Sequence, residues 1–439
     1  QQNEAEKALE LLELRRTHTF ATFMATLSKY DSPLESFVDY NRQVEALHLK
    51  RAELVSQGNE LSRDSSQDTL AHAVMDSLEY LKNDIYAQDP QAGRLLFPFS
   101  DDSIRSSTTP SDSTTIAAYY YNENTLFLWT VTPDGIEVFT SPFDRAELQR
   151  HIRLLYQNLK TRSDVTQQSR ALYDILIRPW RAQFQRTPHL RIVPFHSLYY
   201  VPFALLKNEN DTYLMDDVNL SYTTELRAEP QRTAKTADRS WLSHTVAFTA
   251  PSFDNVNQKL ELSTNTAEYL WPLSQSTSVF SGERATEQRF KSVNFDTATV
   301  YAGTELVFDA RSPLHSALLF TPTLSDDGRF EFREMIHHRF SPDALVVGSA
   351  QQRQAYFANG SERFILFTLF RRLGMQMVCV PQWSSDNMAS AALTKHFFLN
   401  VANGSSTPAA LREAQRLIRQ QVDAYEAAWA GFHIFVLSH

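Results

Sequence analysis

The stretch Asp343–Gln354, DALVVGSAQQRQ, constrains the fold more than any other part of the chain. Its apolar run Ala344–Val347 ends in two β-branched valines, a turn at Gly348–Ala350 follows, and the next residues are polar. A buried strand of a parallel sheet has this form at its carboxyl end. The stretch Asp296–Glu305, DTATVYAGTE, has the same form and predicts a neighbouring strand. Because open α/β sheets carry ligands and catalytic side chains at the carboxyl ends of their strands, we expect a site where these two strands end.

Composition excludes several classes of function. The net charge of −9 argues against nucleic acid or an anionic membrane as the main partner. No stretch approaches the roughly 20 apolar residues that a membrane span needs. The single cysteine, Cys379, excludes an internal disulfide and a multi-cysteine zinc site, and we expect it to be a buried structural thiol. No cofactor motif or metal-ligand cluster is present, so we expect no cofactor and no metal.

Glycine is scarce, with 11 among 439 residues against an average near 7%. Tight catalytic loops use glycine for positive φ angles and for close backbone approach to a ligand. The shortage therefore disfavours a glycine-lined active site. The chain begins at Gln1 without a methionine, so we expect a trimmed or processed product whose targeting segment lies outside the sequence. The cytoplasm is the favoured compartment.

The order of the patterns predicts a helical region followed by a large α/β domain. Residues 1–99 show helical spacing of apolar side chains and are interpreted as a connector or as the tail of a helical repeat array. Residues 100–114 are a polar linker rich in Ser, Thr and Asp. Residues 115–439 form one domain with halves at 115–240 and 241–439. The first half begins with an antiparallel β meander, and strands and helices alternate from residue 189 onward. This alternation predicts a mostly parallel sheet flanked by helices.

Several segments resemble the CHAT domain, the bacterial branch of the caspase, separase and gingipain clan of cysteine peptidases. The segments are AAYYYNENTLFLWTVTPDG (117–135), LRIVPFHSLYYVPFALL (190–206), SPLHSALLF (312–320), VCVPQWSSDNMASAALTKHFF (378–398), ALREAQRLI (410–418) and WAGFHIFV (429–436). The resemblance covers about residues 115–439. It implies a caspase-like fold, often found behind tetratricopeptide repeats.

The resemblance also implies a catalytic dyad of histidine and cysteine on adjacent strand ends, which this chain lacks. The histidine pattern, H-x-A-x-H-G, falls on Val300–Glu305 and places Thr304 at the histidine and Glu305 at the following glycine. The cysteine pattern, L-S-A-C-x-T-G, falls on the stretch after Val347 and places Gln351 at the cysteine. Threonine has no useful basicity near neutral pH, and a glutamine amide is not a nucleophile. Two other alignments place Tyr301 in the cleft or Ala350 at the cysteine, and neither restores the dyad.

We therefore expect a catalytically inactive, degenerate CHAT domain that acts as a protein-binding or regulatory module. Its partner is expected to be a protein or peptide, such as an active caspase-like peptidase. The residues expected to line the cleft are Gly303, Glu305, Ser349, Gln352, Arg353, Trp383, Ser384 and Asp386. One alternative is an active CHAT cysteine endopeptidase whose catalytic residues were replaced by engineering. Another is a structural adaptor that acts through its N-terminal helices.

Overall fold

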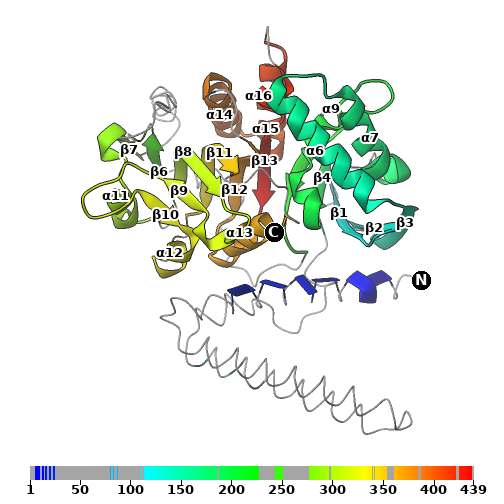
Figure 1. Ribbon diagram of the computed structural model, residues 1–439, viewed down its shortest axis with the longest axis horizontal. Helices are drawn as coiled ribbons and strands as arrows, with labels where there is room; N and C mark the ends of the chain where they lie inside the picture. Colours follow the sequence, from blue (N-terminus) through cyan, green and yellow to red (C-terminus); the bar gives the residue numbers. More distant parts are fainter. Residues whose placement is uncertain are drawn as a thin grey trace. The chain divides into compact units, whose positions relative to one another are not determined.

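The architecture is described from a computed structural model (Figure 1). The described residues are 5–9, 12, 13, 15, 16, 19, 20, 23, 24, 80, 83, 87, 110, 113–184, 187–226, 242, 244–249, 251, 276–295, 298–338, 340, 342–352, 360–383, 387–421 and 425–437. The chain divides into two compact units, one of Gln1–Leu9 with Ile104–His439 and one of Glu10–Ser103. The described residues before residue 88 are helical, as the sequence predicts. The predicted limits of the helical region and the linker, and the repeat-array origin, stay predictions.

The described strands of the larger unit form one sheet that is mostly parallel. Its order is β10-β9-β8-β11-β12-β13-β5-β4-β1-β2-β3, with β6 paired to β8 and β7 paired to β6. In Figure 1 it runs from β10 on the left to β3 on the right. The strands are β1 Thr114–Tyr121, β2 Thr125–Thr132, β3 Gly135–Pro142, β4 His189–Val193, β5 Asn219–Tyr222, β6 His244–Thr249, β7 Ser276–Ser281, β8 Thr299–Phe308, β9 Ala317–Leu319, β10 Arg329–Glu331, β11 Ala344–Gln352, β12 Met377–Pro381 and β13 Phe432–Val436.

The pairing confirms the α/β class predicted from the sequence. Strands β6, β7, β8, β11 and β12 form a parallel block, and β13, β5, β4 and β1 form a second parallel set. The meander β1-β2-β3 is antiparallel, as predicted. The two parallel sets join through the antiparallel pair β12–β13. The strands expected from the opening stretch and from Asp296–Glu305 are direct neighbours, β11 and β8.

Helices cover both faces of the sheet, and local sequence explains several of their ends. The Asp144 side chain accepts hydrogen bonds from Ala146 N and Glu147 N and so caps α6. Helix α14 packs on β11, and α15 packs on β5 and β13. The described α-helices after residue 113 are α6 Arg145–Thr161, α7 Thr166–Leu176, α8 Arg181–Phe184, α9 Leu214–Asp217, α11 Glu287–Ser292, α12 Phe332–His337, α13 Ser361–Arg372, α14 Asn387–Ala402, α15 Thr407–Arg419 and α16 Glu426–Trp429.

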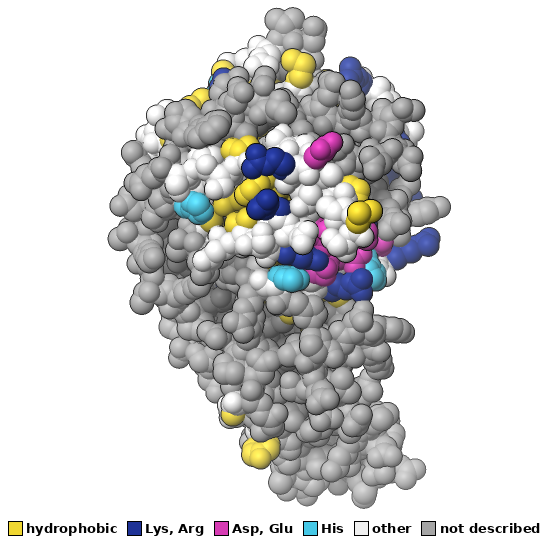
Figure 2. Space-filling model, turned by 90° about the vertical axis from the view of Figure 1, so that its left-hand side faces the viewer, with side chains coloured by type: hydrophobic (Ala, Val, Ile, Leu, Met, Phe, Trp, Pro, Cys, Tyr) yellow, Lys and Arg dark blue, Asp and Glu magenta, His cyan; other side chains and the backbone are white. Residues whose placement is uncertain are grey.

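Two short segments differ from what the sequence predicts. The sequence pattern at Tyr213–Leu214 predicts a short strand, and this prediction is wrong, because Tyr213 forms only an isolated bridge with Lys207 and Leu214 begins α9. Strand β7 was not predicted from the sequence, because its polar run Ser276–Ser278 hides the alternation of a buried strand. Near the end of β7, the guanidinium groups of Arg284 and Arg289 lie 6.0 and 5.3 Å from the centre of the Phe280 ring. Figure 2 shows basic side chains beside hydrophobic surface on this side of the molecule.

Candidate functional site

Strands β8 and β11 run side by side past the positions where the sequence predicted that they would end. Their Cα pairing is regular from Thr299–Ala344 to Ala302–Val347, and resumes with Glu305 opposite Ser349. Two residues of β8, Gly303 and Thr304, therefore lie opposite the single residue Gly348, which is the geometry of a β-bulge. The predicted turn at Gly348–Ala350 is wrong, because these residues continue β11 to Gln352. The apolar residues of β8 after Glu305 pair with the end of β11, and this pairing cannot be seen in the sequence of Asp343–Gln354 alone.

Thr304 is buried, and its hydroxyl group is already hydrogen-bonded. Its side chain is 0% exposed, and its Oγ1 donates a hydrogen bond to the carbonyl oxygen of Leu319 on β9. Gln351 is exposed and lies opposite Val307, three residues beyond Thr304 along β8. At a strand rise of about 3.3 Å per residue, this offset separates the two positions by roughly 10 Å along the strand. The two residues that the resemblance aligns with the dyad are therefore not brought together.

The two alternative positions, Ala350 and Tyr301, are also buried. Ala350 is 0% exposed and Tyr301 is 2% exposed. The Tyr301 ring covers the bulge: a methyl group added to Gly303 would lie 2.8 Å from Tyr301 Cε1, and one added to Gly348 would lie 3.3 Å from Tyr301 Oη. The ring also meets Phe398 of α14 edge-on, with 6.1 Å between the ring centres. The two glycines are thus needed for close packing of Tyr301, and Tyr301 belongs to the core.

Glu305 is the first residue of β8 after the bulge, and its side chain carries a carboxyl group. It is half-buried, and burial alone raises the pKa of its carboxyl group. Ser349, its Cα partner on β11, is 1% exposed, and the Ser349 Oγ has no hydrogen-bond partner within the described residues. Both were predicted to line the cleft, and the structure places them side by side.

The other predicted lining residues have different fates. Trp383, just after β12, donates a hydrogen bond from Nε1 to Ala427 O at 3.0 Å and meets the Tyr156 ring edge-on. Gly431 packs against its indole, where an added methyl group would lie 2.9 Å from Cε2. Trp383 therefore serves as a packing residue. The backbone of Gln352 ends β11. The Gln352 side chain and Arg353, Ser384 and Asp386 lie outside the described residues.

A buried polar network beside these strand ends was missed from the sequence. The Arg363 guanidinium lies between two rings, 4.8 Å from the centre of Tyr200 and 4.7 Å from that of Phe308, the last residue of β8. It donates to the backbone oxygen of Gln382 at 3.1 Å and to the Gln382 side-chain oxygen. The Tyr200 hydroxyl donates to Glu362 Oε1. Arg363 and Glu362 are both 0% exposed, so the start of α13 is fixed by polar contacts within the core.

The network extends to His433 on β13. Gln382 Nε2 lies 2.5 Å from His433 Nδ1, and His433 Nε2 lies 3.4 Å from the Tyr222 hydroxyl. Burial first, and the nearby charge of Arg363 second, hold the pKa of His433 well below its ordinary value. Both effects disfavour the charged form of the ring. It is 2% exposed and shielded from any substrate in solution.

The end of α13 has a second buried anchor. Arg372 Nη2 pairs with Glu225 Oε1 at 2.5 Å, and Arg371 Nη1 donates to Glu225 O at 2.8 Å. The sequence showed α13 as a helix ending near Gly374, but consecutive charged residues in a helix are normally read as a solvated face. Only the tertiary contacts show that these charges are inside.

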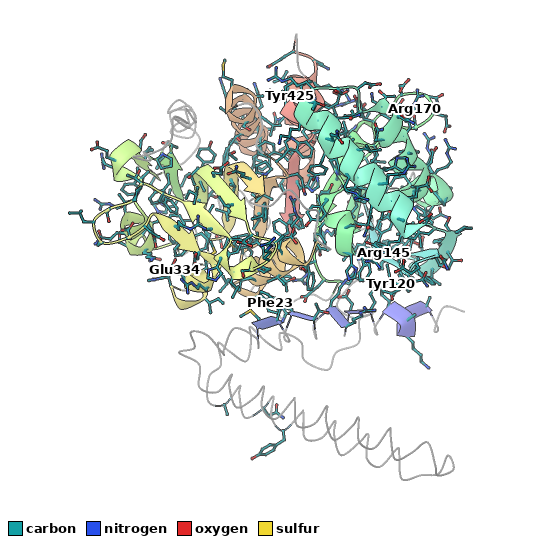
Figure 3. The ribbon with its side chains drawn as sticks, in the orientation of Figure 1. Phe23, Tyr120, Arg145, Arg170, Glu334 and Tyr425 are labelled. Atoms are coloured by element: carbon teal, nitrogen blue, oxygen red, sulfur yellow. The ribbon has the colours of Figure 1, made fainter. Side chains whose placement is uncertain are left out.

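Two further polar side chains, Cys379 and Glu334, have a structural environment. Cys379 is 1% exposed, and burial raises the pKa of its thiol, so it is not a thiolate nucleophile. Glu334 of α12 pairs with Lys291 at 2.6 Å and accepts a hydrogen bond from Glu331 N (Figure 3). Within the described ranges, no group of His, Cys, Asp or Glu side chains is arranged to hold a metal ion. None of the described helices has the length and hydrophobicity needed to cross a bilayer.

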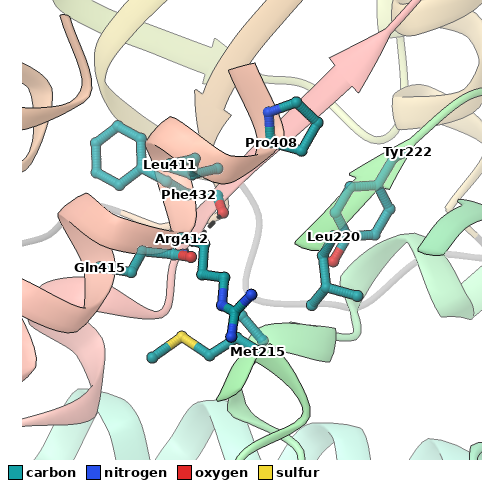
Figure 4. Close-up of a pocket in the computed structure, with 9 residues that line it drawn as sticks. Met215, Leu220, Tyr222, Pro408, Leu411, Arg412, Gln415 and Phe432 are labelled. Atoms are coloured by element: carbon teal, nitrogen blue, oxygen red, sulfur yellow. Dashed lines mark hydrogen bonds between the residues drawn. The ribbon is translucent and has the colours of Figure 1, made fainter. Parts of the chain in front are cut away.

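A small pocket lies away from β8 and β11, between α15 and β5 (Figure 4). Its one cationic side chain, Arg412, already donates to Asn219 Oδ1 at 3.2 Å and to Asp216 O at 2.6 Å. Asp216 also accepts two bonds from Arg419. The pocket is therefore part of an interhelical ion network, and its cation is already engaged.

Comparison with known proteins agrees with the fold. A family model described as CHAT domain matches residues 166–437, which is more than half of the chain. No curated protein matches the chain.

Proposed function

Because the chain belongs to the CHAT domain family, we propose that it is a catalytically inactive member that binds a protein or peptide partner. The binding surface would be the neighbouring ends of β8 and β11, residues 305–308 and 349–352, which we call the strand-end surface. The partner would be a protein that exposes an extended segment, such as an active peptidase of the same clan. The role would be recognition or regulation.

The observation that carries this proposal is the state of Thr304. At the position where the family pattern has histidine, this residue is fully buried, and its hydroxyl is bonded to Leu319 O. Nucleophilic catalysis needs a nucleophile and a base within hydrogen-bond distance of each other. The described residues of the strand-end surface offer a half-buried carboxyl group, a buried hydroxyl group and an exposed amide, with no histidine or cysteine among them.

The scaffold around the positions of the missing dyad is rigid, and this rigidity supports a binding function. The bulge, the tight packing of Tyr301 over Gly303 and Gly348, and the buried anchors of α13 together hold the ends of β8 and β11 in a fixed arrangement. Gln351 is exposed at this surface, and Glu305 is partly exposed. A peptide in extended conformation can add contacts to such a rigid strand end.

The test is to incubate the purified chain with a peptide library prepared from a digested proteome and to sequence any products by mass spectrometry. We expect no cleavage above the level of a Thr304→Ala variant. Cleavage that disappears on replacing Thr304 or Gln351 would refute the proposal and favour an active peptidase. A partner that crosslinks only to the N-terminal helical region would instead favour the adaptor alternative.

A further inference from the structure

Glu305 differs from three carboxylates of similar or greater depth in the described part of the chain. Glu287 shares the Lys291 ammonium group with Glu334, Glu225 pairs with Arg372 at 2.5 Å, and Asp216 pairs with Arg419 at 2.8 Å. No described donor or cation bonds to Glu305, although it is half-buried. Because a carboxylate loses hydration on burial, an uncompensated one is costly to keep. Such a group is a candidate for contact with a ligand.

The neighbour of Glu305 shows the same feature. Ser349 is its Cα partner on the adjacent strand, so the two side chains project from the same face of the sheet. The Ser349 hydroxyl is buried and has no hydrogen-bond partner in the described chain. Buried polar groups nearly always have a partner, so a buried unpaired hydroxyl next to an unpaired, half-buried carboxylate indicates a place that can accept a donor from outside.

The carboxylate of the pair can be reached from solution, and the Ser349 hydroxyl lies buried next to it. Glu305 keeps part of its surface exposed, and Gln351, two residues beyond Ser349, is exposed. The carboxylate accepts hydrogen bonds only, and the serine hydroxyl can also accept one. The chain as a whole has a net charge of −9, which attracts basic segments. Charge and hydrogen-bond capacity both point to a cationic donor.

We propose that Glu305 and Ser349 bind the guanidinium group of an arginine side chain presented by the partner. This inference rests on the proposed binding function and adds the chemical class of the bound residue. A guanidinium group can give two parallel N–H bonds to a carboxylate and still has a further N–H for the serine hydroxyl. The family pattern has glycine at position 305, so the carboxylate is a feature of this chain and not of the pattern.

The experiment uses the full chain and four pools of fluorescein-labelled peptides, each with random flanking residues around a fixed central Arg, Lys, Gln or Glu. Binding is measured by fluorescence polarisation. We expect the arginine pool to bind about tenfold or more tightly than the glutamine pool, the size expected for hydrogen bonds to a charged group. We expect the lysine pool to lie between them, because an ammonium group cannot bind the carboxylate with two parallel bonds.

Three variants locate the effect. Glu305→Gln keeps the shape of the side chain and should abolish the preference for the arginine pool. Ser349→Ala should weaken binding of the arginine pool several-fold. It should not lower the melting temperature of the free protein, because the hydroxyl makes no bond there. Glu137→Gln changes an exposed carboxylate on β3 and should leave binding unchanged.

The outcomes separate this inference from the proposed function. Equal binding of all four uncleaved pools would refute the arginine site and leave the binding function standing. Cleavage of the pools would refute the proposed function. An arginine preference that survives Glu305→Gln, or no binding of the arginine pool to the wild-type chain, would refute the inference.

Discussion

Replacing Gly360 by alanine should destabilise the protein much more than the same replacement at Gly282. Gly360 stands immediately before α13 with φ of +77°, in the left-handed region. A methyl group added there would lie 2.1 Å from the backbone oxygen of His196 and 2.8 Å from its backbone carbon. His196 itself has φ of +48° and belongs to the 3₁₀ turn His196–Tyr200, so it has little freedom to retreat.

The control variant, Gly282→Ala, separates the cost of the left-handed backbone conformation from the cost of a steric clash. Gly282 has φ of +59°, and no atom lies within 4 Å of a methyl group added to it. Its replacement should cost only the left-handed conformation, about 1–2 kcal/mol. At Gly360 the same strain applies, and the collision with backbone atoms adds the cost of overpacking, about 1–3 kcal/mol. We therefore expect a loss of about 2–5 kcal/mol for Gly360→Ala.

Equilibrium urea denaturation of the two variants and the wild type measures these losses directly. Similar slopes of free energy against urea would show that the two variants unfold to comparable states. Gly360→Ala should also weaken peptide binding, because the shift would move the start of α13 and with it Arg363. Equal losses of stability at Gly360 and Gly282 would refute the reasoning, since the backbone contact with His196 would then contribute nothing.

Three further predictions concern the network and the strand ends. Arg363→Met should lower the free energy of unfolding by about 3–5 kcal/mol, because it removes a buried charge from its partners, and a loss below about 1 kcal/mol in urea denaturation would contradict this. The folded state raises the pKa of Glu305, so it binds the proton more tightly than the unfolded state does. The free energy of unfolding should therefore fall as pH rises from the ordinary glutamate pKa through the raised pKa. In thermal melts over that pH range, the melting temperature of Glu305→Gln should change less with pH than that of the wild type. Coincident pH profiles of the two proteins would count against the raised pKa. The double replacement Thr304→His and Gln351→Cys should produce no peptidase activity, because the two positions are offset by three residues; cleavage by this variant would show that they can meet.

Much of the fold was predictable because local patterns carry it. The valines before Gly348 and the apolar run from Val300 predicted two buried strands, and β11 and β8 are neighbours in the sheet. Asp144 begins α6 by capping its first turn, as a short polar side chain before a helical stripe indicates. These features depend on residues that are close in sequence, so the chain reveals them without its tertiary structure.

The parts that were missed depend on distant partners. Strand β11 continues past Gly348 because it pairs with the residues of β8 that follow Thr304. The bulge is visible only when the paired residues of the two strands are compared. The burial of Arg363 requires Tyr200, Phe308 and Gln382, which come from three other segments. Sequence patterns also cannot tell a carboxylate with a countercharge from one without, so Glu305 was predicted only as one lining residue among eight.

The central claim is that the strand-end surface binds a peptide and leaves it intact. The most direct measurement is to form the complex of the full chain with the arginine peptide pool, hold it at working temperature, separate it from unbound peptide and determine the masses of the bound peptides. We predict that every recovered peptide has its full mass, and that Glu305→Gln sharply reduces the amount recovered. Recovery of fragments that are absent when Thr304 or Gln351 is replaced would contradict the account.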